Sequence, residues 1–167
     1  HILAEEGSMQ LYNVLDIQSG VYKPLPLAVE YVNDLEFAAS GLLLYSGSGA
    51  VTHTKVYLYK GGKSEVLFDP APHITRHYKQ TKTEALNYTK SDGTVIEGLL
   101  YYPVNFDKSK KYPCIVFYYG GTSPTSREFE GRYPRNLWTA NGYFVYVVQP
   151  SGATGYGQKF SALHVND

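Results

Sequence analysis

Two apolar runs in the second half of the chain constrain its fold more than any other feature. They are YPCIVFYY at residues 112–119 and YFVYVVQP at residues 143–150. Neither run alternates apolar with polar residues, which is typical of strands buried on both faces of a parallel sheet. A helix-like stretch that stops at Asn141-Gly142 lies between them, and such a pair commonly ends a helix. Strand, helix and strand in this order predict a parallel α/β sheet.

Apolar side chains of this half are expected to supply its core. Leu137, Trp138 and Ala140 of the expected helix should pack in the interior. The single cysteine, Cys114, stands inside the first apolar run, and we interpret it as a core residue rather than a nucleophile. The sheet is expected to have an unpaired edge at the place of a further strand.

A hairpin is predicted just before the first apolar run. The sequence TEALNYTKSDGTVIEGLLYYP has two β-rich segments joined around Asp92-Gly93, and both residues favour the positive φ that tight hairpins need. Pro103 then ends the second segment.

The first half reads as short strands separated by turns. Turn residues occur at Ser19-Gly20, Ser40-Gly41 and Gly61-Gly62, between segments rich in tyrosine, valine and leucine. Such spacing is typical of an antiparallel array such as a propeller blade, and about one blade and part of another fit into residues 8–82. A fragment of a β-sandwich is the alternative, and periodicity does not separate the two.

Composition excludes several classes of function. Lys plus Arg and Asp plus Glu number 15 each, so no basic surface predicts nucleic-acid binding. No apolar run approaches the roughly 18 residues of a membrane helix. The five histidines have no metal-ligand spacing, and we interpret His53 and His77 as surface or inter-blade residues. We therefore expect no metal, no cofactor and no membrane segment.

The best candidate site follows the first apolar run. Ligands bind outside the carboxyl ends of parallel strands, and here Tyr118-Tyr119 is followed by Gly120 and Gly121. Glycines leave backbone amides uncovered, and a tyrosine beside them can place its hydroxyl in the same space. Together they could form an oxyanion site for acyl transfer. The alternative is that the tyrosines merely finish a strand and the glycines merely turn the chain.

The other motifs give no complete site. Gly152, Gly155 and Gly157 follow the second run but do not match G-x-G-x-x-G, and no P-loop Lys-Ser/Thr follows, so we interpret them as a structural loop. The chain contains neither Gly-x-Ser-x-Gly nor H-E-x-x-H, so no nucleophile, acid or base can be assigned within it.

From Asn87 to Asp167 the sequence resembles the prolyl oligopeptidase family of serine peptidases, both its dipeptidyl-peptidase and its acylaminoacyl-peptidase members. The resemblance rests on three motifs in the family's order: SDGTVIEGLLYYP, FDKSKKYPCIVFYYGGTSP and NGYFVYVVQPSGATGYGQKF. It implies that residues 83–167 are the N-terminal portion of an α/β-hydrolase domain, truncated before the nucleophile. By their place in the chain, residues 1–82 would be the C-terminal portion of a β-propeller. The expected fold class is therefore mixed β and α/β.

The resemblance also implies a mechanism. The family's Ser-Asp-His triad would lie beyond this chain, so we expect the sequence to be an inactive piece of a longer enzyme. In dipeptidyl-peptidase-like and prolyl-oligopeptidase-like members a tyrosine before Gly-Gly donates its hydroxyl to the tetrahedral intermediate, and Tyr119 matches that position. Acylaminoacyl-peptidase-like members have a histidine there. The family usually has Asp or Asn and then Arg where this chain has Gln149-Pro150-Ser151, so a charged side chain near the expected site is missing. The pair Glu5-Glu6 is interpreted as an exposed turn.

The leading hypothesis is a serine-type peptidase that acts on short peptides in a dipeptidyl-peptidase-like way. An esterase on the same fold and a non-catalytic propeller-based binding module are the alternatives. The family's habit suggests a periplasmic or secreted protein. A homo-oligomer that covers the unpaired sheet edge is a further expectation.

Overall fold

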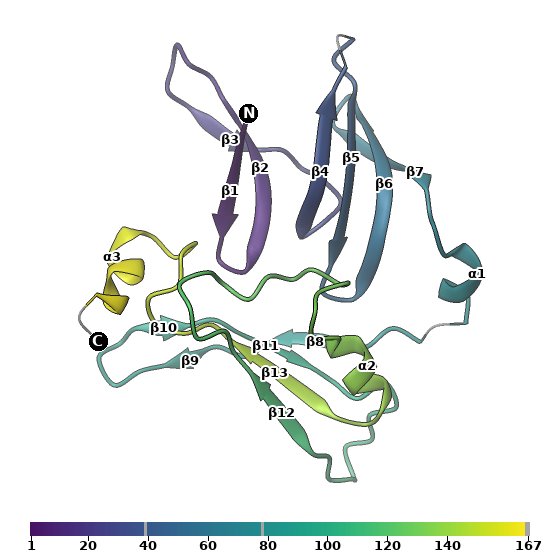
Figure 1. Cartoon of the computed structure of the whole chain (residues 1–167), viewed down its shortest axis with the longest axis vertical. Coiled ribbons are helices and arrows are strands. Elements are labelled where there is room, and N and C mark those ends of the chain that lie inside the picture. The colour runs from purple at the N-terminus through teal and green to yellow at the C-terminus, as the bar shows by residue number, and fades with distance from the viewer. Residues whose placement is uncertain (39, 78, 166–167) are drawn as a thin grey trace. The chain divides into compact units, whose positions relative to one another are not determined.

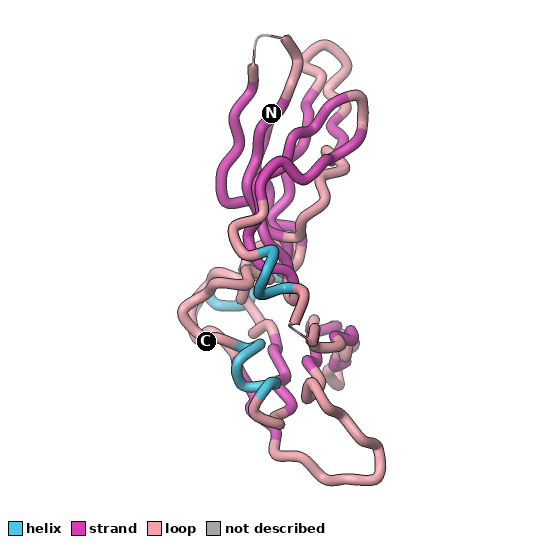
Figure 2. Tube along the Cα trace, turned by 90° about the vertical axis from the view of Figure 1, so that its right-hand side faces the viewer, coloured by secondary structure: helices cyan, strands magenta, loops and turns pink. Residues whose placement is uncertain are grey.

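The computed structural model describes residues 1–38, 40–77 and 79–165, and these residues divide into two compact units (Figure 1). Unit 1 consists of residues 1–77 with 126–130, and unit 2 of residues 78–125 with 131–167. Strands dominate both units, and the helices are short (Figure 2). The mixed, sheet-dominated fold class is confirmed, because antiparallel and parallel pairs both occur.

Unit 1 is built on one sheet in the order β1-β2-β4-β5-β6-β7, with β3 paired to β2. Its elements are β1 (Ile2–Glu6), β2 (Met9–Leu15), β3 (Tyr22–Pro24), β4 (Tyr31–Phe37), β5 (Leu43–Gly49), β6 (Thr52–Lys60), β7 (Lys63–Phe68) and α1 (Pro72–Thr75). Strands β4 to β7 form an antiparallel meander. A single parallel bridge, between Gln10 and Tyr31, joins this meander to β2. A four-stranded meander is the architecture of one propeller blade, but the propeller assignment remains a prediction.

The turns of unit 1 lie where the sequence placed them. The β6–β7 connection consists of Gly61 and Gly62, with φ of 57° and 82°, as a two-residue hairpin loop of the primed type requires. Gly20 and Gly41 also have positive φ, in the connections that follow β2 and β4. Glu5 and Glu6 belong to β1, so their interpretation as a turn is wrong.

The core of unit 1 is aromatic and partly polar. Leu43, Tyr45 and Tyr57 are buried, and the two tyrosine rings stack with their centroids 4.9 Å apart. The Tyr45 hydroxyl accepts a hydrogen bond from the Ala28 amide (3.0 Å) and donates one to Ser64 Oγ (2.7 Å). Both polar functions of this buried side chain are thereby satisfied, as burial demands.

A segment from the second half of the sequence belongs to unit 1. Arg127 forms an ion pair with Glu30 at 2.5 Å and donates from Nε to Ser8 Oγ at 2.8 Å. Glu130 accepts hydrogen bonds from the amide and the hydroxyl of Thr54, at 2.7 and 2.8 Å. Charge-assisted hydrogen bonds of this kind are stronger than neutral ones, so residues 126–130 are firmly held by this sheet.

Unit 2 contains a mixed sheet in the order β12-β13-β11-β8 and a separate two-stranded hairpin, β9-β10. Its elements are β8 (Thr83–Ala85), β9 (Tyr88–Thr89), β10 (Val95–Ile96), β11 (Gly98–Tyr101), β12 (Cys114–Phe117), α2 (Arg135–Ala140), β13 (Phe144–Val148), α3 (Gln158–Ser161) and the 3-10 turn η1 (Ala162–His164). Strands β12 and β13 are parallel, which confirms the parallel pairing predicted for the two apolar runs. The hairpin around Asp92-Gly93 is also confirmed, with Gly93 at φ 84°.

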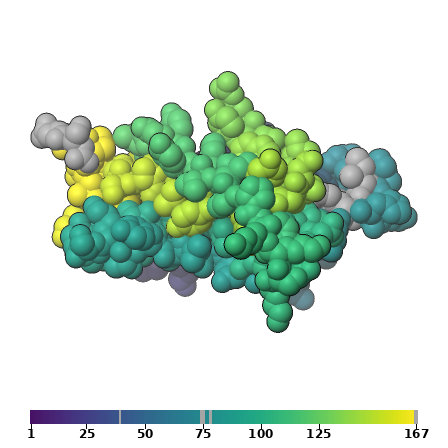
Figure 3. Space-filling model, turned by 90° about the horizontal axis from the view of Figure 1, so that it is seen from below, coloured from purple at the N-terminus to yellow at the C-terminus, as the bar shows by residue number. Residues whose placement is uncertain are grey.

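The expected core of unit 2 is wrong in two places. Strand β12 lies at the edge of its sheet, so Cys114 and Val116 are exposed rather than buried. The view in Figure 3 shows green segments from the middle of the second half of the chain at the surface. Helix α2 packs against β13 and β11, yet Leu137 is 57% exposed, and Ala140 is exposed as well.

Polar residues face inward from α2 instead. Arg135, Asn136 and Thr139 are its buried residues. The Arg135 guanidinium lies 5.9 Å from the centroid of the buried Tyr101 ring, a cation–π contact that suits a partly desolvated cation. The sequence pattern failed here because apolar residues mark a helix face only when something covers that face.

Candidate active site

The carboxyl ends of β12 and β13 lie at the same edge of the unit 2 sheet, because the two strands are parallel (Figure 1). Two loops follow these ends, residues 118–125 after β12 and residues 149–157 after β13. The amide of Thr154 donates a hydrogen bond to the Thr122 carbonyl at 2.8 Å, so the two loops are in direct contact. The edge at which a ligand site was expected is therefore formed by two mutually bonded loops.

Tyr119 stands on the first of these loops with 54% of its side chain exposed. Its ring lies over Gly121: a Cβ atom at that position would be 2.5 Å from the Tyr119 Cε1 atom. A Cβ atom at Gly120 would meet nothing within 4 Å. Glycine at 121 thus makes room for the aromatic ring, while the exposed phenol can donate a hydrogen bond to a ligand. The role of Tyr119, Gly120 and Gly121 remains a prediction.

Gln149 departs from the family pattern and is buried, with 2% exposed. The Thr125 amide donates to its Oε1 at 2.8 Å, and its Nε2 donates to the Thr125 carbonyl at 2.9 Å. A polar amide directly after an apolar strand was the sequence signal, since such a residue, once buried, needs partners.

The second loop is bonded to the rest of the sheet. Tyr156 donates from its hydroxyl to a Glu97 carboxylate oxygen at 2.6 Å, and the Gln149 amide donates to the Glu97 carbonyl at 2.9 Å. Gly152 has φ 91°, and a Cβ atom there would lie 2.6 Å from the Cβ atom of His164. These contacts fix the loop against Glu97 and His164.

His53 is part of an ionic cluster in unit 1. Its Nε2 lies 2.8 Å from Asp69 Oδ1, and Lys55 Nζ lies 2.9 Å from Asp69 Oδ2. Hydrogen bonds from Lys55, then His53, then the Ala71 amide hold the pKa of Asp69 well below its ordinary value. Among the described residues, no three or more His, Cys, Asp or Glu side chains form a group that could hold a metal ion.

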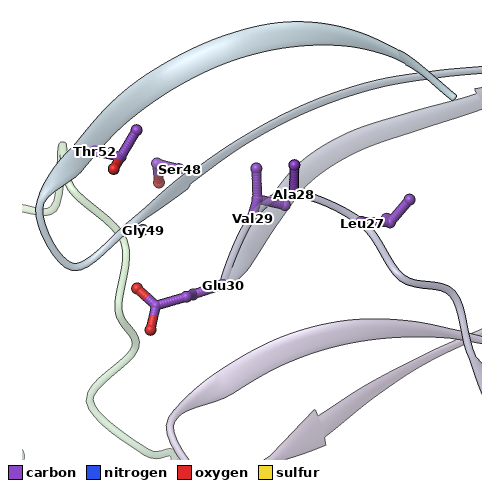
Figure 4. Close-up of a pocket in the computed structure, with 7 residues that line it drawn as sticks. All are labelled: Leu27, Ala28, Val29, Glu30, Ser48, Gly49 and Thr52. Carbon is purple, nitrogen blue, oxygen red and sulfur yellow. The ribbon is translucent and has the colours of Figure 1, made fainter. Parts of the chain in front are cut away.

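A cavity of about 280 Å³ lies in unit 1 (Figure 4). It is lined by Leu27, Ala28, Val29, Glu30, Ser48, Gly49 and Thr52. Its one charged residue is already engaged, because Glu30 binds Arg127 and accepts a hydrogen bond from the Ala50 amide at 2.8 Å. The cavity offers no unpaired charge for a ligand.

None of the helices in the described part of the chain is long and apolar enough to cross a membrane.

The chain was compared with family models, with curated proteins and with solved structures. No family model matches the chain. Dipeptidyl-peptidase 5 of Aspergillus fumigatus is 34% identical over 128 residues, which are 73% of this chain and 18% of that protein. The chain therefore spans about a fifth of the length of this relative.

Solved structures share the fold at lower identity. The acylaminoacyl peptidase of Pyrococcus horikoshii superposes with a TM-score of 0.76 at 22% identity, over 95% of this chain and 24% of that one. An acylaminoacyl peptidase in complex with Z-Gly-Gly-Phe-chloromethyl ketone gives a TM-score of 0.81 at 21% identity, with the same coverage.

Proposed function

Because this chain belongs to the prolyl oligopeptidase family of serine peptidases, we propose that it is part of a peptidase that hydrolyses short peptides in a dipeptidyl-peptidase-like manner. The observation that carries the proposal is the exposed Tyr119 phenol beside Gly120-Gly121, at the carboxyl end of a parallel strand. The matched segment is 18% of the dipeptidyl-peptidase 5 of Aspergillus fumigatus, which leaves room for the remaining catalytic residues elsewhere in the full-length protein.

In this proposal unit 2 contributes the start of the α/β-hydrolase domain, with residues 83–167 as its N-terminal portion. Residues 1–82 contribute the end of a β-propeller. The meander of β4 to β7 supports the latter assignment, since it has the strand number and direction of one blade. The parallel β12–β13 pair, with α2 between its strands, supports the former.

The mechanism assigns charge stabilisation to this chain. A serine outside the chain attacks the scissile carbonyl carbon while a histidine accepts its proton, and the carbonyl oxygen becomes an oxyanion. Tyr119 donates its hydroxyl hydrogen to that oxyanion, together with a backbone amide. The histidine then returns the proton to the leaving amine as the tetrahedral intermediate collapses to the acyl-enzyme, which water hydrolyses.

Peptides are the proposed substrates. The peptidic inhibitor bound to the acylaminoacyl peptidase of similar fold supports a peptide-binding cleft in this family. The tyrosine at position 119 favours dipeptidyl-peptidase-like over acylaminoacyl-peptidase-like activity, because a histidine is expected there in the latter. A chromogenic dipeptidyl amide should therefore be cleaved faster than an acylated amino-acid amide or a simple acyl ester.

Replacement of the phenol tests this role. In the full-length enzyme, Tyr119→Phe should lower kcat for a dipeptidyl chromogenic substrate about 100- to 1,000-fold, because one oxyanion donor is lost. KM should change by about two-fold or less, since the hydrogen bond forms mainly in the transition state.

Tyr118→Phe is the matched control. This neighbouring tyrosine is 62% exposed and is expected to keep kcat within about three-fold of the wild-type value. Wild-type kcat in Tyr119→Phe would refute the role of the phenol, and an unmodified full-length protein that cleaves none of the three substrates would refute peptidase activity itself.

A further inference from the structure

Gln149 is fixed at the end of β13 and reaches the loop that carries Tyr119. Its own amide donates to the Glu97 carbonyl at 2.9 Å, which ties its backbone to the segment before β11. Its side-chain amide pairs with both backbone groups of Thr125, at 2.8 and 2.9 Å. This two-bond pattern is the one by which neighbouring strands pair, except that a side chain supplies one partner.

The loop after β12 has no helix or strand of its own. It runs from Tyr118 to Thr125. At its far end, Thr125 is hydrogen-bonded to the side chain of Gln149, the residue directly after β13. A second hydrogen bond, from the Thr154 amide to the Thr122 carbonyl, also holds this loop. Tyr119 lies in the chain between the end of β12 and these two hydrogen-bonded residues. A loop held only at its two ends would sample more conformations than one that is also hydrogen-bonded at Thr122 and Thr125, so these bonds reduce the conformational freedom of Tyr119.

We propose that Gln149 is a positioning residue for the Tyr119 hydroxyl: by holding Thr125, its side-chain amide keeps the loop in the conformation in which the phenol points at the oxyanion. This inference rests on the proposed function. Gln149 is buried and is assigned no contact with the substrate.

The chemistry of the side chain supports this role. Holding Thr125 requires one donor and one acceptor in fixed geometry, which a carboxamide supplies and a carboxylate does not. Oxyanion donors act because they are preorganised, and a shift of about 1 Å in a reacting group can reduce the rate about 100-fold. A side chain that fixes the loop is therefore expected to affect kcat without touching the reacting atoms.

The test uses the full-length enzyme and a dipeptidyl chromogenic substrate. Gln149→Ala should lower kcat about 10- to 100-fold and leave KM within about two-fold. The reason is that a less ordered loop weakens the hydrogen bond from Tyr119, which forms mainly in the transition state. Gln158→Ala, at an exposed glutamine of α3, is the matched control and should leave both constants unchanged. Wild-type kcat in Gln149→Ala would overturn the inference while leaving the proposed function intact.

A pH profile and a double variant separate positioning from general damage. In Gln149→Glu the ionised carboxylate accepts from the Thr125 amide but repels its carbonyl, whereas the protonated form regains a donor. The ratio of its kcat to that of the wild-type enzyme should therefore rise as the pH is lowered. A ratio independent of pH would contradict the inference, and this readout decides the question if Gln149→Ala fails to fold.

If Gln149 acts through Tyr119, then Tyr119→Phe combined with Gln149→Ala should lose no more than about three-fold beyond Tyr119→Phe alone. A loss equal to the product of the two single effects would show that Gln149 acts elsewhere. An active enzyme in which Tyr119→Phe has no effect would refute the phenol's role and this inference together, and inactivity of the unmodified enzyme would refute the peptidase proposal as well.

Discussion

Leu43 in unit 1 and Leu137 in unit 2 both stand in apolar segments, but only one of them is buried. Leu43 opens β5, between two antiparallel neighbours, and packs with Tyr45 and Tyr57 at 2% exposure. Leu137 lies on α2 and is mostly exposed, while the polar residues of the same helix face the sheet. The difference teaches that apolar character identifies a strand or helix but does not say which of its faces is covered.

Chain connectivity explains the contrast. Strands β4 to β7 are joined by short turns, so each strand finds its partners next to it in the sequence. In unit 2 the sheet order β12-β13-β11-β8 brings together segments that are far apart in the sequence. The partners of a strand are therefore set by its neighbours in the sequence in the meander, and by distant segments in the mixed sheet with an open edge.

The largest expected effect comes from a leucine-to-alanine pair of variants. Leu43→Ala should reduce the free energy of unfolding by about 2–5 kcal/mol, because it leaves a cavity among buried side chains. Leu137→Ala should change it by about 0.5 kcal/mol or less, since the side chain is mostly exposed. Urea denaturation followed by circular dichroism measures both. Equal losses of unfolding free energy in the two variants would show that Leu137 is buried in the protein, and would contradict the difference between the two leucines.

Buried hydroxyl groups should give an intermediate effect. Tyr45→Phe in unit 1 removes both an acceptor for Ala28 and a donor to Ser64, and should cost about 1–3 kcal/mol of unfolding free energy. In unit 2, Tyr146→Phe removes one hydrogen bond to the Leu86 carbonyl and should cost about 0.5–1.5 kcal/mol.

Tyr22→Phe, at an exposed residue of β3, is the control for the loss of a hydroxyl alone. Denaturation curves of the three variants should rank Tyr45 first and Tyr22 last, and a reversed order would contradict the role of Tyr45 as the hydrogen-bonded centre of the unit 1 core.

The smallest effect concerns charge and depends on pH. Folding lowers the pKa of Asp69 below its ordinary value of 3.8, through Lys55, His53 and the Ala71 amide. The stabilisation is therefore complete above about pH 4 and is lost as the pH falls through the lowered pKa of the folded state. Asp69→Asn should unfold more easily than the wild-type protein at pH 7, and the two should converge as the pH is lowered below 4.

Glu84→Gln in unit 2 is the variant with which the pH-dependent loss of stability in Asp69→Asn is compared. Its carboxylate is half exposed and pairs with Lys82, so water screens the ion pair and the pH-dependent difference should be smaller. Thermal unfolding at a series of pH values tests both variants. A difference between wild type and Asp69→Asn that grows below pH 4 would contradict the sign of the pKa shift.

The sequence predicted the hairpins and the strand pair of unit 2 but not the burial within it. Asp92-Gly93 and Gly61-Gly62 identified turns because positive φ is a local property of those residues. Cys114 was wrongly assigned to the core, since its exposure depends on whether another strand pairs with β12. At the candidate site, Tyr119 was singled out from its neighbours, whereas Gln149 was missed because its partner, Thr125, is 24 residues away.

By itself the sequence determined where the strands turn, that β12 and β13 run parallel, and which family the chain belongs to. These properties reside in adjacent residues: glycines that accept positive φ, apolar runs of strand length, and motifs in a fixed order. Only the tertiary structure decided that the edge strand exposes Cys114, that α2 buries its polar side, and that Gln149 holds Thr125. Each of these features depends on which distant segments of the chain come into contact. Burial and hydrogen-bond partners are set by those contacts and not by any residue alone.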